Sequence, residues 1–324
     1  MPTDEMRDAT MGEGLVIRAL SGFFTVRTAD GRDVVCKLRG RLKQTRHETD
    51  IVTIGDRVVF QLAEDGSGVI ESVQPRVRAL VRRARVVGRR KFAARGMGHL
   101  EQDRGVVIVA NPDLAVFVFA CANPTPSLRM LDRFLVVAEA NQIPVLICAN
   151  KVDLVGIDAA KALFGLYEDI GYSVVYTSAH TGDGKLVLQG HLAGKLAVLT
   201  GPSGVGKSSL LNQIDPALGQ AVGDISVATG KGRHTTVHPE LFPLPGGGWL
   251  ADTPGIRSLA MYDLTPEELD GYFVEIAPLV SQCEFRDCAH QYEPGCAVRA
   301  ALEQGKLHFS RYDSYIRLRN GIYD

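Results

Sequence analysis

The residues from Gly201 to Ser208 have the types and spacing of a phosphate-binding loop. They read GPSGVGKS, with two glycines five positions apart followed by lysine and serine. Backbone N–H groups of such a loop can turn towards phosphate oxygens, the Lys207 ammonium can face the β- and γ-phosphates, and the Ser208 hydroxyl can hold Mg²⁺. A chance glycine-rich turn is the alternative, which the apolar run before the loop disfavours. The residues predicted to contact the phosphates are Gly201, Ser203, Gly204, Val205, Gly206, Lys207, Ser208 and Ser209.

A second short motif predicts which base is bound. Asn150, Lys151 and Asp153 follow an apolar stretch with the spacing N-K-x-D. A carboxylate at Asp153 can accept from both N1–H and the exocyclic amino group of guanine, whereas adenine lacks this pair of donors. Ser178 and Ala179 follow the next apolar stretch, where a backbone N–H suits the guanine O6. Four residues match by chance in many chains, but together with the phosphate loop they predict a site for GTP and GDP.

Two further segments are predicted to act at the γ-phosphate and Mg²⁺. In the segment D-T-P-G, Asp252 can reach Mg²⁺ through water and the N–H of Gly255 can face the γ-phosphate. Residues 230–236, GKGRHTT, form a basic glycine-rich segment in which Thr235 or Thr236 can offer a hydroxyl to Mg²⁺. Such a loop would act as a switch that depends on the γ-phosphate, although a simple surface turn is the alternative.

A cluster of cysteines and one histidine predicts a metal site. Four such residues lie within fourteen positions: Cys283, Cys288, His290 and Cys296. Three thiolates and one imidazole suit tetrahedral Zn²⁺, and four protein ligands leave no position for a catalytic water. The sequence therefore predicts one structural Zn²⁺ per chain. A disulfide or a set of inert thiols is the alternative. The other cysteines, Cys36, Cys121 and Cys148, are scattered and are predicted to be buried thiols.

Strands and helices alternate around the nucleotide motifs. Apolar runs at 114–122 and 143–153 predict buried parallel strands, with a helical stretch at 128–142 between them. Each motif follows such a run, and a doubly wound sheet binds its ligands at the carboxyl ends of its strands. The sequence therefore predicts an α/β domain over residues 106–276.

The order of the motifs is unusual for a GTPase. The phosphate loop ordinarily comes first and N-K-x-D late, but here N-K-V-D precedes the loop by about fifty residues. The predicted P-loop GTPase domain is therefore circularly permuted, and D-T-P-G becomes its last motif. We expect the nucleotide state to be transmitted through residues 256–276 to the tail that follows.

The predicted GTPase domain is flanked by two smaller units. Short alternating runs with Gly and Asp turns over residues 1–75 predict a five-stranded antiparallel barrel of OB type, which could bind nucleic acid or be purely structural. Residues 76–105 are predicted to be a basic linker, because Arg76 to Arg95 includes nine basic residues and no acid. Such a block favours RNA contact over simple solvation. Residues 277–324 are predicted to form a helical zinc-binding domain.

Composition sets the broad class of the protein. The 324 residues, 45% hydrophobic and 23% charged, are typical of a soluble globular protein. The sequence has neither a long apolar run nor a secretion signal, which predicts a cytoplasmic protein that does not span a membrane. The net charge of −1 hides an asymmetry, because residues 1–100 carry +7 and residues 101–324 carry −8. A basic front end predicts a polyanionic partner.

The full combination resembles the ribosome small-subunit-dependent GTPase A family of bacteria and plastids. The resemblance rests on the barrel, the motif order and the spacing C-x₄-C-x-H-x₅-C, and it spans nearly the whole chain from about residue 12. It implies a GTP hydrolase that binds the small ribosomal subunit and its rRNA late in maturation, hydrolyses GTP faster on the subunit and then departs. We expect the protein to act as a monomer.

The resemblance also implies catalytic residues. Ile256 occupies the position where many GTPases carry a water-orienting glutamine, and an aliphatic side chain cannot orient water. The family's suggested candidate is His234, beside Thr235 and assisted by Lys207, although His234 could contact only RNA. Residues 111–114 read NPDL where the family often has NVDQ, which leaves open a hinge or nucleotide-stacking role. Two other functions remain open: a regulatory protein that uses GTP as a timer, and a translation factor that binds tRNA.

Overall fold

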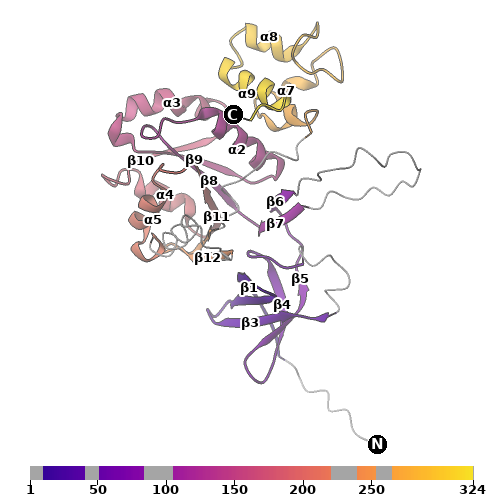
Figure 1. The fold of residues 1–324 in the computed structure, drawn as a ribbon, viewed down its shortest axis with the longest axis vertical. Coiled ribbons are helices and arrows are strands. Elements are labelled where there is room, and N and C mark those ends of the chain that lie inside the picture. Colours follow the sequence, from indigo (N-terminus) through magenta and orange to yellow (C-terminus); the bar gives the residue numbers. More distant parts are fainter. Residues whose placement is uncertain (1–9, 41–50, 84–104, 220–238, 253–264, 324) are drawn as a thin grey trace, which may run out of the picture.

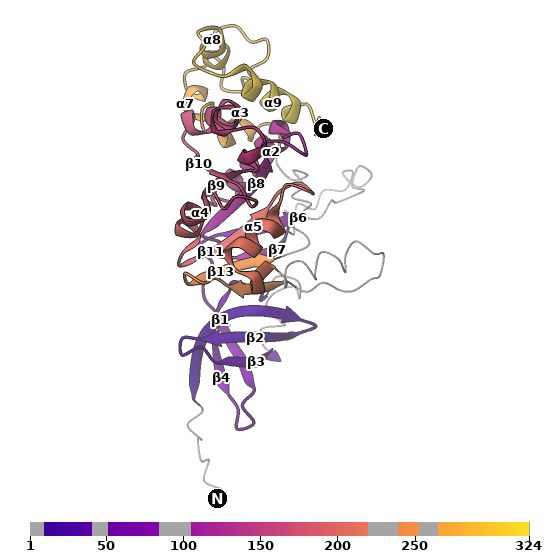
Figure 2. The same cartoon turned by 90° about the vertical axis from the view of Figure 1, so that its left-hand side faces the viewer.

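The computed structural model describes residues 10–40, 51–83, 105–219, 239–252 and 265–323. Within these ranges the protein is elongated, and a barrel, an α/β sheet and a helical tail follow one another along its long axis (Figures 1 and 2). None of the helices in the described ranges is both long and apolar enough to cross a bilayer.

Five strands form the barrel at one end of the molecule: β1 (Met11–Leu20), β2 (Phe23–Thr28), β3 (Asp33–Leu38), β4 (Arg57–Leu62) and β5 (Gly68–Val73). They pair in the order β1-β2-β3-β5-β4, and β4 pairs again with β1 to close the barrel. Val26, Cys36 and Ile70 are fully buried inside it. The pairing of β3 with β5 is parallel, not antiparallel as predicted. Strand directions cannot alternate around a closed ring of five strands, so one parallel pair is required.

The predicted linker over 76–105 is partly a strand. Strand β6 (Ala79–Arg83) pairs antiparallel with β7 (Gly105–Ala110), while residues 84–104 lie outside the described residues. The guanidinium of Arg76 forms a two-pronged ion pair with the fully buried Asp56 of the barrel, with both N···O distances at 2.7 Å. A buried carboxylate needs a charged partner, and Arg76 supplies it. The count of basic residues could not reveal this role.

Asn111 joins the barrel to the α/β sheet. Its backbone is left-handed, with φ of 52°, and its side chain donates to the Gly55 carbonyl at 3.0 Å while accepting from the Val77 N–H at 2.8 Å. A Cβ atom at Gly55 would lie 2.0 Å from the Ala110 carbonyl oxygen, so the two backbones touch. Asn111 precedes the first strand of the main sheet. It therefore lies at the barrel junction, away from the carboxyl ends of the strands where the nucleotide motifs gather.

The central sheet has the strand order β10-β9-β8-β11-β13-β12. Its strands are β8 (Leu114–Ala120), β9 (Val145–Asn150), β10 (Ser173–Thr177), β11 (Lys195–Thr200), β12 (Glu240–Pro243) and β13 (Gly248–Asp252). All neighbours are parallel except β12, which pairs antiparallel with β13 and was not predicted. A single register pair, Arg18 with Glu240, links β12 to the barrel strand β1. The phosphate-loop strand β11 lies between β8 and β13, as a circular permutation requires.

Helices cover both faces of this sheet, and the central strand β8 contributes side chains to the core on each face. Phe117 and Phe119 pack in the core that includes α2 (Leu128–Ala140) and α3 (Ile157–Asp169). Val116 and Val118 pack in the core that includes α4 (Lys185–Leu192) and α5 (Lys207–Ile214). All seven residues of β8 are buried. The doubly wound α/β architecture predicted from the continuous apolar runs is present.

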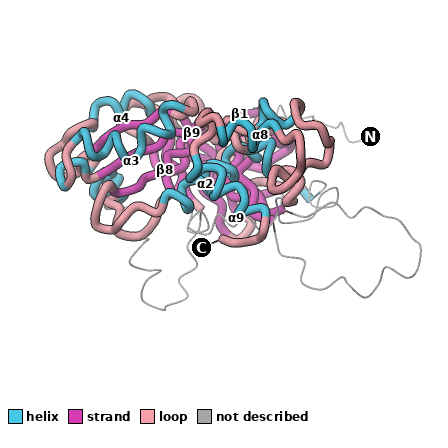
Figure 3. Tube along the Cα trace, turned by 90° about the horizontal axis from the view of Figure 1, so that it is seen from above, coloured by secondary structure: helices cyan, strands magenta, loops and turns pink. Residues whose placement is uncertain are grey.

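In the described part of the tail, the buried apolar side chains share one core with the GTPase domain. After η3 (Leu269–Tyr272) the tail contains α7 (Ala277–Val280), α8 (Ala297–Glu303) and α9 (Phe309–Arg319). Its fully buried Tyr315 belongs to the same apolar cluster as α2 and α3, and so does Phe273, which directly follows η3. Viewed from above, α9 lies beside α2 (Figure 3). The tail is therefore packed on α2, one of the helices that cover the GTPase sheet.

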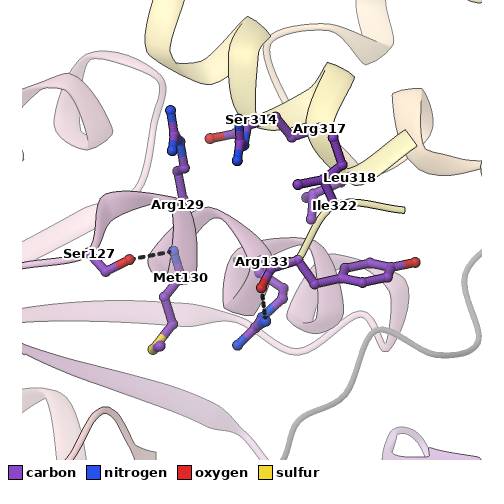
Figure 4. Close-up of a pocket in the computed structure, with 9 residues that line it drawn as sticks. Ser127, Arg129, Met130, Arg133, Ser314, Arg317, Leu318 and Ile322 are labelled. Atoms are coloured by element: carbon purple, nitrogen blue, oxygen red, sulfur yellow. Dashed lines mark hydrogen bonds between the residues drawn. The ribbon is translucent and has the colours of Figure 1, made fainter. Parts of the chain in front are cut away.

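The seam between α2 and α9 is polar at its outer edge (Figure 4). Ser127 caps α2 by accepting from the Met130 N–H at 3.3 Å. Arg133 donates to the Tyr323 carbonyl at 2.8 Å, and Arg129 pairs with Asp313 at 3.0 Å. The cavity between these side chains measures about 30 Å³, the volume of about one water molecule.

Candidate active site and metal centre

The predicted phosphate loop lies between β11 and α5, at the carboxyl end of the central strand. Gly201 packs so closely on β8 that a Cβ atom there would lie 2.1 Å from the Val118 carbonyl oxygen. Gly206 has φ of 97°, and its Cβ would lie 2.5 Å from the Asn150 side-chain nitrogen. The loop can adopt this path only because both positions are glycine.

Two lysines hold the loop in this arrangement. The Lys207 ammonium donates to the carbonyls of Gly201 at 2.8 Å and Pro202 at 2.6 Å, so its charge lies inside the loop. The Lys151 ammonium donates to the Gly204 carbonyl at 2.7 Å and to the Asn123 carbonyl. Lys151 thus ties the segment that is predicted to bind the base to the predicted phosphate loop. No sequence signal marked Asn123, because its carbonyl would serve equally well in any residue.

Asn150 is a buried residue whose side chain connects several segments of the site by hydrogen bonds. Its side-chain nitrogen donates to the Val205 carbonyl at 2.8 Å, and its oxygen accepts from the Thr177 hydroxyl at 3.1 Å and the Ala179 N–H at 3.3 Å. Its side chain is fully buried. Asn150 therefore joins the phosphate loop, β9 and the segment after β10 in one hydrogen-bonded unit.

Asp153 is exposed at the rim of this unit. The Ser178 hydroxyl donates to one oxygen of its carboxylate at 2.5 Å. A carboxylate has about four lone-pair positions, so Asp153 keeps the capacity to accept from two guanine donors. Gln213 of α5 donates to the Ala179 carbonyl at 2.7 Å and supports the same segment. The sequence did not mark Gln213, since its role depends on a contact with a segment 34 residues away in the chain.

The remaining predicted residues divide between the loop and segments that the structure leaves out. Ser203 and Gly204 lie exposed in the loop, Val205 is buried beneath it, and Ser208 and Ser209 are exposed in the first turn of α5. Asp252 ends β13 beside β11, and its side chain is outside the described residues. The predictions for His234, Thr235, Thr236 and Gly255, and the comment on Ile256, also lie outside the described residues.

The predicted metal ligands come together in the tail. The ligand atoms of Cys283, Cys288, His290 and Cys296 all lie within 4.8 Å of one another. Nδ1 of His290 is 3.6 Å from the Cys283 sulfur and 3.4 Å from the Cys296 sulfur. Ligand bonds of about 2.0–2.3 Å in a tetrahedron place neighbouring ligand atoms roughly 3.5 Å apart, so the donor set and its spacing fit Zn²⁺. All six cysteines of the chain are free of disulfides.

The three scattered cysteines are buried thiols, as predicted. Burial is the largest cause that raises the pKa of Cys36 and Cys121 to about 11, and the pKa of Cys148 to about 12. These thiols are protonated at neutral pH and are poor nucleophiles or metal ligands.

Glu293 shapes the loop that carries His290. Its carboxylate accepts from the backbone N–H groups of Ala289 at 2.9 Å, Gln291 at 2.9 Å and Tyr292 at 3.0 Å. Desolvation works against the charge, but these hydrogen bonds, with one from its own N–H, lower the pKa of the Glu293 carboxyl to about 2. The charged carboxylate is therefore the form that stabilises the loop.

We expect Glu293→Gln to destabilise the tail by about 1 kcal/mol at neutral pH, because a carboxamide replaces a charged acceptor. The folded-state pKa lies below the ordinary value of 4.5, so the contribution is present above pH 4.5 and is lost as the pH falls towards 2. Denaturant midpoints of both proteins across this range test the expectation. Glu303→Gln, on an exposed side chain of α8, is the control. A constant difference from pH 7 to pH 3 would contradict the expectation.

Comparison with known proteins decides the family. The family model described as RsgA GTPase matches residues 89–262, and the RsgA N-terminal domain model matches residues 13–70. The chain belongs to the RsgA GTPase family. Its curated RsgA relatives include the "small ribosomal subunit biogenesis GTPase RsgA" of Gemmatimonas aurantiaca, 41% identical over 317 residues that cover 97% of this chain and 98% of the relative. The protein of the same name from Moorella thermoacetica is 41% identical, covering 94% and 95%.

Solved structures agree with the RsgA assignment. YjeQ from Thermotoga maritima superposes with a TM-score of 0.77 at 34% identity and covers 97% of this chain and 99% of its own. YloQ, described as a circularly permuted GTPase, superposes with a TM-score of 0.73 at 32% identity, covering 99% and 98%. These matches confirm the predicted family, the permuted GTPase fold and GTP hydrolysis as the activity. The RsgA GTPase family implies a guanine nucleotide and Mg²⁺ as the ligands.

Proposed function

We propose that this GTPase is a late-stage assembly factor of the small ribosomal subunit. The observation that supports this function is that relatives named for small-subunit biogenesis match nearly the whole of both chains, barrel and tail included. A likeness limited to the GTPase sheet would support only nucleotide hydrolysis. On this proposal the partner is the subunit with its rRNA, which stimulates hydrolysis, and hydrolysis releases the protein. It acts as a monomer in the cytoplasm.

The residues of the site are assigned roles in the same proposal. Asn150, Lys151, Asp153, Ser178 and Ala179 hold the guanine, and the loop from Gly201 to Ser209 holds the phosphates. Phosphate oxygens are stronger partners for the Lys207 ammonium than the carbonyls of Gly201 and Pro202, so we infer that the lysine turns to the β- and γ-phosphates when GTP binds. Mg²⁺ neutralises phosphate charge when it is bound, and Ser208, Asp252, Thr235 and Thr236 are the residues proposed to hold it.

The tail is proposed to bind one Zn²⁺ through Cys283, Cys288, His290 and Cys296. The closeness of the four ligand atoms, all within 4.8 Å of one another, and their donor types support this assignment, and the role would be structural. Metal analysis of the purified protein should find one Zn²⁺ per chain. The barrel limit at residue 75 and the GTPase limit at residue 276 stay predictions, as does rRNA contact by the basic residues from Arg78 to Arg95.

The test is GTP turnover with and without purified small subunits. The proposal predicts slow turnover alone and a large increase on the subunit, whereas a protein that uses GTP only as a timer would show none. His234→Ala should abolish the increase and leave GTP affinity unchanged. If His234→Ala is stimulated as strongly as the wild type, His234 contacts only RNA. Co-sedimentation with subunits and with tRNA at physiological salt separates a subunit partner from a tRNA partner.

A further inference from the structure

The imidazole of His290 has a partner on each of its two nitrogens. Nδ1 faces the sulfurs of Cys283 and Cys296, at 3.6 Å and 3.4 Å. Nε2 lies 3.2 Å from a carboxylate oxygen of Asp270, which belongs to η3 and precedes the four-ligand motif in the chain. The His290 side chain is fully buried and that of Asp270 is 16% exposed.

We propose that Asp270 is a positioning residue for the metal centre. Its carboxylate accepts the Nε2–H of His290, which leaves the Nδ1 lone pair directed at the centre of the cysteine cluster. When one nitrogen of a histidine binds a metal, a carboxylate that accepts from the other nitrogen orients the ring and makes the imidazole a stronger electron donor to the metal. The inference rests on the metal site proposed above and adds a residue outside the ligand set.

Asp270 also connects the metal centre to the segment that follows the last nucleotide motif. Residues 269–276 are held to the tail at two more points. The rings of Phe273 and Tyr315 meet edge-to-face at 5.6 Å, and the Glu275 carboxylate accepts two hydrogen bonds from Arg311, at 2.6 Å and 3.1 Å. We call residues 265–276 the connector, because they lead from the segment after D-T-P-G into the tail.

This arrangement couples metal binding to docking of the connector. The Asp270 carboxylate can orient His290 only while η3 is packed against the segment from Cys283 to Cys296, which carries the four proposed ligands. By linkage, whatever strengthens the docked state strengthens metal binding, and metal binding strengthens docking by the same factor. Asp270 therefore makes the connector part of the metal centre.

Metal release from the full-length protein loaded with Zn²⁺ tests the proposal. Excess chromogenic chelator reports the rate for the wild type, Asp270→Ala and Asp270→Asn. We expect about 10- to 100-fold faster release from Asp270→Ala. Asp270→Asn should fall between it and the wild type, because a carboxamide oxygen still accepts the Nε2–H but carries no charge. Glu267→Gln, an exposed carboxylate on the same connector, should release metal at the wild-type rate.

The outcomes separate the inference from the proposed metal site. If the wild type binds no Zn²⁺, the site itself is wrong. If the wild type binds Zn²⁺ and both Asp270 variants release it at the wild-type rate, the positioning role alone is wrong. If Asp270→Ala misfolds and loses its GTP affinity, its metal release cannot be interpreted. The metal release rates of Asp270→Asn and Glu267→Gln then decide whether Asp270 positions His290, because Asp270→Asn keeps a hydrogen-bond acceptor at that position.

Hydrogen exchange gives a second readout that a purely local role would not move. Chelation of the wild type should accelerate exchange in residues 268–276, and Asp270→Ala should show that faster exchange even with Zn²⁺ bound. Unchanged exchange in this segment after chelation would overturn the coupling.

Discussion

Asp153→Asn should convert the nucleotide site from one that prefers GTP to one that prefers XTP. In the proposed site the carboxylate accepts from N1–H and the exocyclic amino group of guanine, while a carboxamide presents an N–H to one of these donors. Xanthine has a carbonyl oxygen at the same position and accepts from that N–H. Two hydrogen bonds to a charged group are worth about 1.5–3 kcal/mol each, so GTP affinity should fall about 100- to 10,000-fold.

The structure makes this substitution a specific one. The Ser178 hydroxyl donates to one oxygen of Asp153, and the carboxamide oxygen of asparagine can accept the same bond. Because Asp153 is exposed, its replacement leaves the apolar core intact. Titrations with fluorescent GDP and XDP measure the change, with Asp158→Asn in the first turn of α3 as the control. Unchanged affinity for both nucleotides would remove Asp153 from the base-reading site.

Arg311→Met should destabilise the packing of the tail on α2 of the GTPase domain by about 3–5 kcal/mol. The Arg311 side chain is fully buried, and it donates to Asp132 of α2 at 2.7 Å and to Glu275 of the connector at 2.6 Å. Its guanidinium also lies 4.6 Å from the centre of the Phe273 ring. Burial opposes its charge, but attraction to Asp132 and Glu275 outweighs burial and raises the Arg311 pKa.

The size of the effect comes from the carboxylates left behind. Asp132 and Glu275 are 2% and 10% exposed, so without Arg311 they would hold buried charges that lack a cationic partner. Denaturant unfolding measures the loss as a lower midpoint of the first transition. Arg129→Met removes an ion pair with Asp313 from the same seam, but Arg129 is 52% exposed, so a loss of at most about 1 kcal/mol is expected. Equal losses in the two variants would show that burial is not the cause.

Asn150 shows how far motif spacing can reach. The N-K-x-D spacing marked it as a guanine contact, and the structure adds that its buried amide joins three segments. Its partners Val205 and Thr177 are 55 and 27 residues away in the chain. A motif contains no information about which distant carbonyl will lie beside its side chain, because that depends on how neighbouring strands pack.

Arg76 shows where a charge pattern misleads. It was counted in the basic block predicted to meet RNA, but it pairs with Asp56 inside the barrel junction. Sequence shows that a cation and a carboxylate are present, whereas only the fold decides that this carboxylate is buried and needs a cation. Strand β12 was missed for a similar reason, since four residues at a sheet edge carry too little periodicity to be distinguished from a loop.

The sequence by itself determined the GTPase chemistry and the permuted order of the domain, and it marked the four candidate metal ligands. Each motif consists of residues a few positions apart, and the permutation follows from the order in which the motifs occur along the chain. The tertiary structure decided which distant residues contact these motifs and hold the tail in place. It placed Asp270 behind His290, 20 residues away, and Arg311 against Asp132, 179 residues away. Such contacts arise when the connector and the tail pack on each other and on α2, and that packing joins residues whose separation in the chain carries no pattern.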